Sequence, residues 1–212
     1  MPTFSTPEPI SAAISLVVGD VAVTASDRDD TVVEVHPSDP HREQDVRAAE
    51  QTRVEFAAGR LVVKAPRPRV LGVWGKVGSI DITVDLPTDS AVESDASVGG
   101  FRSTGRLGNC RLKSATGDIR LDGTGDLIVH TGAGAISVES VGGAADLSTG
   151  SGRIEVAHIG ETLWSRTPTA TTGSARSPGI YGSRPRTATS SSVAPGATSM
   201  RRLRTARSGS AR

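Results

Sequence analysis

Several kinds of residue are scarce in this sequence of 212 residues. Aromatic residues make up only 3% of it, and the single cysteine, Cys110, excludes an intramolecular disulfide and lacks the basic surroundings of a reactive thiol. No stretch approaches the roughly 20 consecutive apolar residues of a membrane-spanning helix. The N-terminal residues lack the basic and apolar regions of a secretory signal. We therefore expect a cytoplasmic protein without a membrane span.

Acidic residues are absent after Glu161, which divides the chain by charge. Residues 1–162 carry 15 basic and 23 acidic side chains, a net of −8, whereas residues 163–212 carry nine arginines and no acid. The tail is rich in Ser, Thr, Pro, Arg and Gly, which is the composition of a disordered segment. An arm that binds nucleic acid is the alternative interpretation. Its arginines are widely spread, however, with only Tyr181 as an aromatic partner after Trp164, so the tail offers no stacking platform.

Glycine is abundant, with 24 residues, and the apolar residues are mostly Val, Ile, Leu and Ala, a mixture that favours short strands and turns. Residues 10–36 alternate short β-prone runs with turns, which predicts a meander of antiparallel strands. One helix is predicted from Asp39, as its N-cap, to Glu50. A hairpin is expected over residues 53–64 and a strand over residues 80–86. Residues 1–90 are thus predicted to form an antiparallel β region with one short helix.

A repeat begins near residue 91 and is marked by four glycines at nearly equal spacing. A bulky apolar residue follows each glycine two positions later, and three of the units have a second one two positions beyond. The turn glycines are Gly99, Gly117, Gly134 and Gly152, and the apolar residues are Phe101, Ile119, Leu121, Ile136, Val138, Ile154 and Val156. Each unit therefore predicts a strand, a glycine turn and a second strand.

A single unit has too little apolar surface to fold alone, whereas stacked units would share one core. Stacking predicts an interior column made by the first apolar residue of each unit and a second column made by the next. Glycine suits the corners because they commonly need a positive φ. The predicted fold class is all-β, with a β-solenoid-like stack over residues 91–162. An ordinary β-sandwich with similar hairpins is the alternative.

The rhythm of the repeat continues into the tail, at Thr169, Thr187 and Thr205. Back-translation of residues 163–172 in a shifted reading frame yields a further repeat, with its glycine in register. We therefore hypothesise that residues 163–212 are a disordered, frame-shifted truncation of a longer repeat. The DNA sequence across codons 155–212 tests this hypothesis.

Motifs for catalysis, cofactors and metals are weak. The Gly-x-Gly segments at residues 132–134 and 150–152 neither complete a dinucleotide-binding pattern nor open a helix. The four histidines have no metal-ligand spacing. Asp118 is replaced by Ala135 and Arg153 in the next two units, so a calcium ladder is not indicated. We expect no catalytic, cofactor-binding or metal-binding residues.

The repeat units at residues 117–121 and 148–156 resemble a bacterial β-strand-repeat family of unknown function whose members are called adhesin-like. Residues 14–35 and 47–55 look like those of actinobacterial members. The resemblance covers about residues 1–162 and ends at the tail. It implies a β-solenoid-like fold, with no established catalytic residue, cofactor or substrate.

These observations favour a non-catalytic scaffold that binds an unknown protein partner or itself by strand addition at the open end of the stack. A polymerising β-helix similar to the bactofilin cytoskeleton is one alternative. A polysaccharide-active β-helix enzyme is another, because Asp118, Arg120 and Asp122 could lie near one another.

Overall fold

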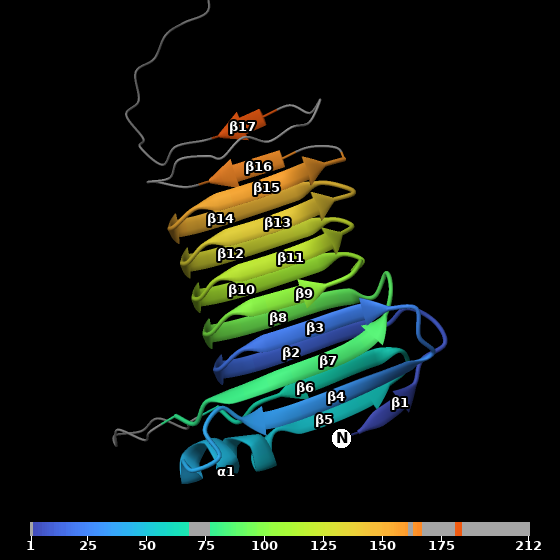
Figure 1. Ribbon diagram of the computed structural model, residues 1–212, viewed down its shortest axis with the longest axis vertical. Helices are drawn as coiled ribbons and strands as arrows, with labels where there is room; N and C mark the ends of the chain where they lie inside the picture. The colour runs from blue at the N-terminus through green and yellow to red at the C-terminus, as the bar shows by residue number, and fades with distance from the viewer. Residues whose placement is uncertain (1, 68–76, 161–162, 167–180, 184–212) are drawn as a thin grey trace, which may run out of the picture.

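The computed structural model of this protein describes residues 2–67, 77–160, 163–166 and 181–183. These residues are mostly β-strand, with one helix, α1 (Glu43–Gln51). The strands form two open sheets (Figure 1). In spatial order, sheet A contains β1 (Thr3–Ser5), β4 (Asp30–Pro37), β7 (Ile80–Pro87), β3 (Val21–Ser26), β9 (Phe101–Thr104), β11 (Ile119–Thr124), β13 (Ile136–Val141) and β15 (Ile154–Ile159). Sheet B contains β17 (Tyr181–Ser183), β16 (Leu163–Arg166), β14 (Ala145–Ser151), β12 (Leu127–Ala133), β10 (Cys110–Thr116), β8 (Ala91–Val98), β2 (Ser11–Val18), β6 (Arg60–Lys64) and β5 (Arg53–Ala57).

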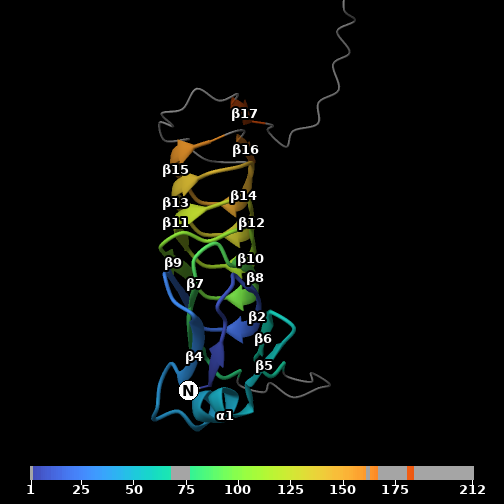
Figure 2. The same cartoon turned by 90° about the vertical axis from the view of Figure 1, so that its right-hand side faces the viewer.

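The two sheets face each other, and the chain from β8 to β15 passes alternately between them (Figure 2). We call one strand of sheet B with the following strand of sheet A a repeat unit: β8–β9, β10–β11, β12–β13 and β14–β15. Equivalent strands pair in parallel, with Cys110 beside Val92 and Leu127, and with Ile136 beside Ile119 and Ile154. The sequence separation of the paired residues is the spacing of the repeat glycines.

The meander expected over residues 10–36 is wrong. Strand β2 pairs in parallel with β6 and β8, and β3 pairs in parallel with β7 and β9. Consecutive strands here lie in opposite sheets, and an alternating apolar pattern is the same whether a turn leads back to the same sheet or across to the other. Antiparallel pairing is confined to β1–β4, β4–β7 and the expected hairpin β5–β6 among the described strands. Both sheets therefore run across the boundary expected at residue 90.

The helix α1 begins at Glu43, later than the predicted start at Asp39. The Asp39 carboxylate instead accepts a hydrogen bond from the backbone N–H of His41, at 2.9 Å, in the turn that precedes the helix. The buried Asp45 accepts one from the backbone N–H of Ser79, at 3.0 Å. This bond ties the helix to the residues just before β7.

The disorder expected from Leu163 onward is wrong at two segments. Strand β16 pairs in parallel with β14, with Leu163 beside Ala145, and β17 pairs in parallel with β16, with Tyr181 beside Leu163. In both pairs, the sequence separation of the partner residues equals the length of a repeat unit, so these strands continue the register of sheet B. The remainder of the tail lies outside the described residues.

The core lies between the two sheets and is filled by columns of side chains from equivalent positions. In sheet A, Ile119, Ile136 and Ile154 are 1%, 0% and 3% exposed and lie in register. Burial of each isoleucine side chain stabilises the fold by about 1.5 to 3 kcal/mol. Since each unit covers the apolar residues of its neighbours, no unit has a core of its own.

A column of glycines marks the corner where the chain crosses from sheet B to sheet A. Gly19, Gly99, Gly117, Gly134 and Gly152 all have φ between +132° and +151°. A Cβ added to Gly134 would lie 2.1 Å from the carbonyl oxygen of Gly117, and one on Gly117 would lie 1.9 Å from that of Gly99. Both the backbone angle and the close approach of the next unit therefore require glycine.

We expect Gly134→Ala to lower the free energy of unfolding by about 3 kcal/mol, because the methyl group would force the two units apart in a strained backbone conformation. Gly142→Ala is the matched control, since its nearest neighbour would be the Thr124 carbonyl oxygen at 3.5 Å, an ordinary contact. Urea unfolding followed by circular dichroism measures both. Equal losses in the two variants would contradict the role given to the glycine column.

Candidate functional site

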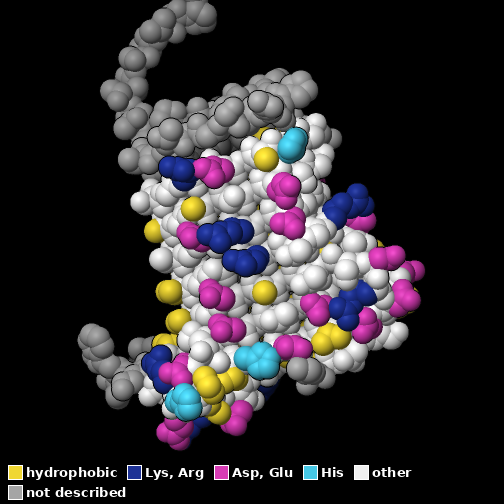
Figure 3. Space-filling model, in the orientation of Figure 1, with side chains coloured by type: hydrophobic (Ala, Val, Ile, Leu, Met, Phe, Trp, Pro, Cys, Tyr) yellow, Lys and Arg dark blue, Asp and Glu magenta, His cyan; other side chains and the backbone are white. Residues whose placement is uncertain are grey.

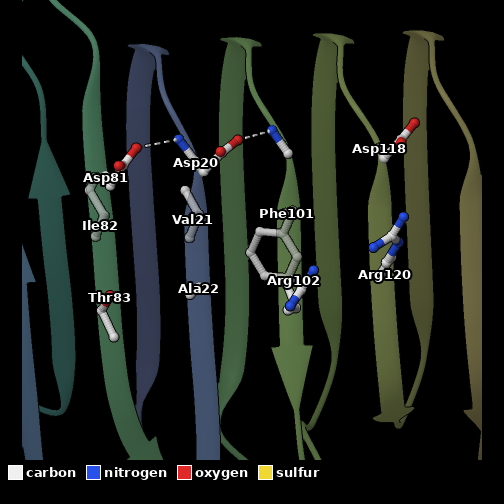
Figure 4. A pocket seen from close by; sticks show the side chains of 11 residues that line it. Asp20, Val21, Ala22, Asp81, Ile82, Thr83, Phe101, Arg102, Asp118 and Arg120 are labelled. Carbon is white, nitrogen blue, oxygen red and sulfur yellow. Dashed lines mark hydrogen bonds between the residues drawn. The ribbon is translucent and has the colours of Figure 1, made fainter. Parts of the chain in front are cut away.

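A row of carboxylates lies beside the glycine column, at the start of the sheet A strands. The Asp81 carboxylate accepts a hydrogen bond from the backbone N–H of Asp20 at 3.3 Å, and that of Asp20 accepts one from Gly100 at 2.7 Å. Asp118 accepts one from the backbone N–H of Ala135, at 2.8 Å. Each carboxylate therefore binds the equivalent residue of the adjacent strand and holds neighbouring units in register (Figure 4).

The opposite corner repeats this device. The side-chain oxygen of Asn109 accepts a hydrogen bond from the backbone N–H of Asp126, at 3.2 Å. The Asp126 carboxylate in turn accepts one from Ala144, at 3.0 Å. Because an uncharged amide does the same work as a carboxylate here, the corner needs a hydrogen-bond acceptor and no negative charge.

The three residues of the enzyme hypothesis lie on one face of β11 and its preceding turn, where Asp118 and Arg120 line one groove and Asp122 lines the neighbouring one. Asp118 is bound to Ala135, and the Asp122 carboxylate accepts a hydrogen bond from the backbone N–H of Gly105, at 3.1 Å. Asp118 and Arg120 are exposed on the outer face of sheet A. Both carboxylates thus act on the backbone of neighbouring strands.

The outer face of sheet A carries a groove of about 550 Å³, whose lining residues come from β7, β3, β9 and β11. Its floor is a row of in-register residues, in which Arg102 and Arg120 are direct neighbours. Ala22 is beside Arg102 on one side, and Ser137 is beside Arg120 on the other. Figure 3 shows two adjoining basic side chains among acidic and uncharged ones on this face, and Figure 4 shows both arginines below the row of aspartates.

The charges of β8 and β10 in sheet B are arranged differently. On its outer face Arg111 is in register with Glu93, and Lys113 is in register with Asp95. Each base on β10 therefore faces an acid on β8, whereas the two arginines of sheet A face each other. This contrast makes the Arg102–Arg120 pair the best candidate for a binding site.

The residues selected from the sequence lie at the corners and in the interior. The four turn glycines form the crossing column, and the seven apolar residues, from Phe101 to Val156, are at most 6% exposed. Sequence analysis missed Gly19 and Val21, which join the same columns. The likeness of Gly19-Asp20-Val21 to Gly117-Asp118-Ile119 was the available signal. It also missed Arg102, although its separation from Arg120 equals that of Gly99 from Gly117 and so places the two arginines in register.

Cys110 belongs to the core. It lies in the sheet B column between Val92 and Leu127 and is 3% exposed. Burial raises the pKa of its thiol to about 12. The thiol is therefore protonated at neutral pH and is unsuited to nucleophilic chemistry.

Within the part of the chain that the structure describes, no three His, Cys, Asp or Glu side chains are grouped so that they could hold a metal ion. No helix among these residues is long and apolar enough to cross a membrane.

No protein-family model matches this chain. No curated protein matches it either. Among solved structures, a "putative adhesin" from Bacteroides fragilis is 11% identical, with a TM-score of 0.35, over 81% of this chain and 90% of that one. A "putative cell adhesion protein" from Clostridium sporogenes is 11% identical, with a TM-score of 0.33, over 79% and 71%. A "putative adhesin" from Parabacteroides distasonis is 12% identical, with a TM-score of 0.30, over 86% and 94%. At these values the likeness establishes neither a family nor a function for this chain.

We expect the Cys110 thiol to react very slowly with a disulfide reagent such as Ellman's reagent at pH 8, because burial keeps it protonated and inaccessible. Unfolding in guanidinium restores an ordinary thiol pKa, so the same sample should then react rapidly and completely. Absorbance of the released thiolate measures both rates. Fast reaction of the folded protein would contradict the placement of Cys110 in the core.

Proposed function

We propose that this chain is a non-catalytic β-solenoid scaffold of the adhesin-like β-strand-repeat type, whose outer faces bind a partner. The observation that carries the proposal is that the acidic side chains at both corners serve as acceptors for the backbone of the adjacent strand. An enzyme of this shape would need carboxylates free to exchange protons with a substrate.

The parallel register supports the solenoid interpretation. Successive repeat units pair with their neighbours in both sheets, at the regular spacing of the glycine column. Strands in register lie about 4.8 Å apart, so each unit advances the stack by that distance. Such an architecture presents long open faces on which outward side chains form regular rows, which suits binding better than enclosing a substrate.

Substitutions of Asp118 distinguish the scaffold proposal from the enzyme hypothesis. Asp118→Asn keeps an oxygen acceptor for Ala135, as Asn109 does at the other corner, so we expect stability within about 0.5 kcal/mol of the original. Asp118→Ala removes the acceptor and should lower the free energy of unfolding by about 1 kcal/mol. Urea unfolding measures both variants.

The same proteins should release no reducing sugar from a panel of neutral and acidic polysaccharides. If the original chain cleaves one of them and Asp118→Asn abolishes that cleavage, the carboxylate is catalytic and the scaffold proposal fails.

The two ends of the stack differ. At the N-terminal end the short strand β1, the antiparallel hairpin β5–β6 and the helix α1 close the sheets, with Ala48 and Ala49 packed against the core (Figure 2). At the other end, the parallel register continues through β16 and β17 without an antiparallel strand among the described residues. Antiparallel caps and covering helices are what block strand addition.

We expect any self-association to use the C-terminal end alone, which produces closed dimers and no filaments. Light scattering during size-exclusion chromatography, over a wide range of protein concentrations, should show a monomer that shifts toward a dimer. Filaments in electron micrographs would contradict this and favour a bactofilin-like polymer. A monomer at every concentration would remove self-association from the proposal.

A further inference from the structure

Arg102 and Arg120 are two adjacent positive charges in the acidic part of the chain, residues 1–162. Their Cα atoms are register partners on the parallel strands β9 and β11, and both side chains are exposed. Neither arginine forms a salt bridge with another residue in the described part of the chain. Residues 1–162 have a net charge of −8, so two basic side chains side by side stand out against their surroundings.

The pair costs the fold some stability. Side chains that are directly opposite on paired strands lie about 5 Å apart, and like charges at such positions are destabilising. The chain avoids this between β8 and β10 of sheet B, where Arg111 faces Glu93 and Lys113 faces Asp95, although Arg53 faces Lys64 in the hairpin β5–β6 at the edge of that sheet. An anionic ligand that accepts hydrogen bonds from both guanidinium groups would offset the repulsion.

The residues around the two arginines indicate which other chemical groups the ligand carries. On the side of β3, Ala22 is in register with Arg102, and its small side chain leaves room in the groove above the sheet. Asp20 and Asp118 line the same groove. Each of them uses one carboxylate oxygen on a backbone N–H, which leaves the other oxygen as an acceptor. The groove thus places two cationic donors beside a row of acceptors.

The opposite side of the pair is acidic. Arg120 also lines a neighbouring groove, together with Asp122, Glu139 and Glu155. A polymer with a charge on every unit, such as a nucleic acid, would meet these carboxylates as it followed the row. The site therefore favours a ligand with an isolated negative charge and several hydroxyl groups.

We propose that this groove binds an acidic saccharide, with the sugar carboxylate held between Arg102 and Arg120 and its hydroxyl groups donating to Asp20 and Asp118. This inference rests on the proposed scaffold function and names the ligand class of one of its faces. The guanidinium groups match a carboxylate because they donate paired hydrogen bonds in one plane. The aspartates match sugar hydroxyls, which a bare anion such as phosphate does not supply.

Calorimetric titration of the full chain with galacturonic acid, which has a single carboxylate, tests the proposal, and its methyl ester and inorganic sulfate serve as comparison ligands. We expect the acid to bind and the ester and sulfate to bind at least about tenfold more weakly, because the ester lacks the charge and sulfate lacks the hydroxyl groups. Arg102→Gln/Arg120→Gln should weaken binding of the acid at least about tenfold. The unfolding free energy of this variant should be unchanged or higher, because the repulsion is gone.

Two further variants control the experiment. Arg111→Gln removes a positive charge from the outer face of sheet B and should leave binding unchanged. Ala22→Glu keeps both arginines but places a carboxylate in register with Arg102, so it should compete with the sugar and abolish binding.

Equal affinity for sulfate, or an equal loss in Arg111→Gln, would show attraction to any anion and overturn the proposal. Absence of binding to the original chain would also overturn it. None of these three results affects the scaffold function, which fails only if Asp118-dependent cleavage is found.

Discussion

The close approach of backbone to backbone at one corner is the constraint on which the parallel pairing of the repeat units depends. Where the chain crosses from sheet B to sheet A, each unit rests on the carbonyl group of the unit before it, and a Cβ on Gly117 or Gly134 would overlap that carbonyl oxygen. Because the crossing is so tight, the strands on either side of it are brought into register, and the apolar columns follow from that register. The packing of the hydrophobic core therefore depends on the tight crossing at this corner.

Strict register also decides what the surface can do. Residues one repeat apart in the sequence become neighbours, so any side chain repeated at that interval forms a row across the sheet. The aspartates and Asn109 use this regularity to bind the next backbone and stabilise the stack. The same regularity holds Arg102 and Arg120 side by side, and two like charges in such positions lower the stability of the fold. A costly arrangement on the outer face of sheet A is a mark of binding, and it contrasts with the matched charges of β8 and β10 in sheet B.

The N-terminal residues show how the repeat is adapted at its end. Gly19 and Val21 lie in the same columns as Gly117 and Ile119, although they are far apart in the sequence. Strands β2 and β3 are therefore a further unit placed beneath β8 and β9, and the chain between them and β8 builds the closing strands and α1. This segment, together with β1, contains the antiparallel pairs, where parallel pairing ends.

Sequence alone determined the parts of this protein that depend on local pattern. The all-β character, the spacing of the units, the turn glycines and the inward apolar residues could all be predicted, because each repeats at a fixed interval within a short window. The hairpin β5–β6 was predictable for the same reason. Only the tertiary structure decided that β2 pairs in parallel with β8, that β3 pairs in parallel with β9, and that Gly19 stacks beneath Gly99. These are pairings between distant segments, and a local pattern of apolar and polar residues is the same for a strand whichever neighbour it acquires.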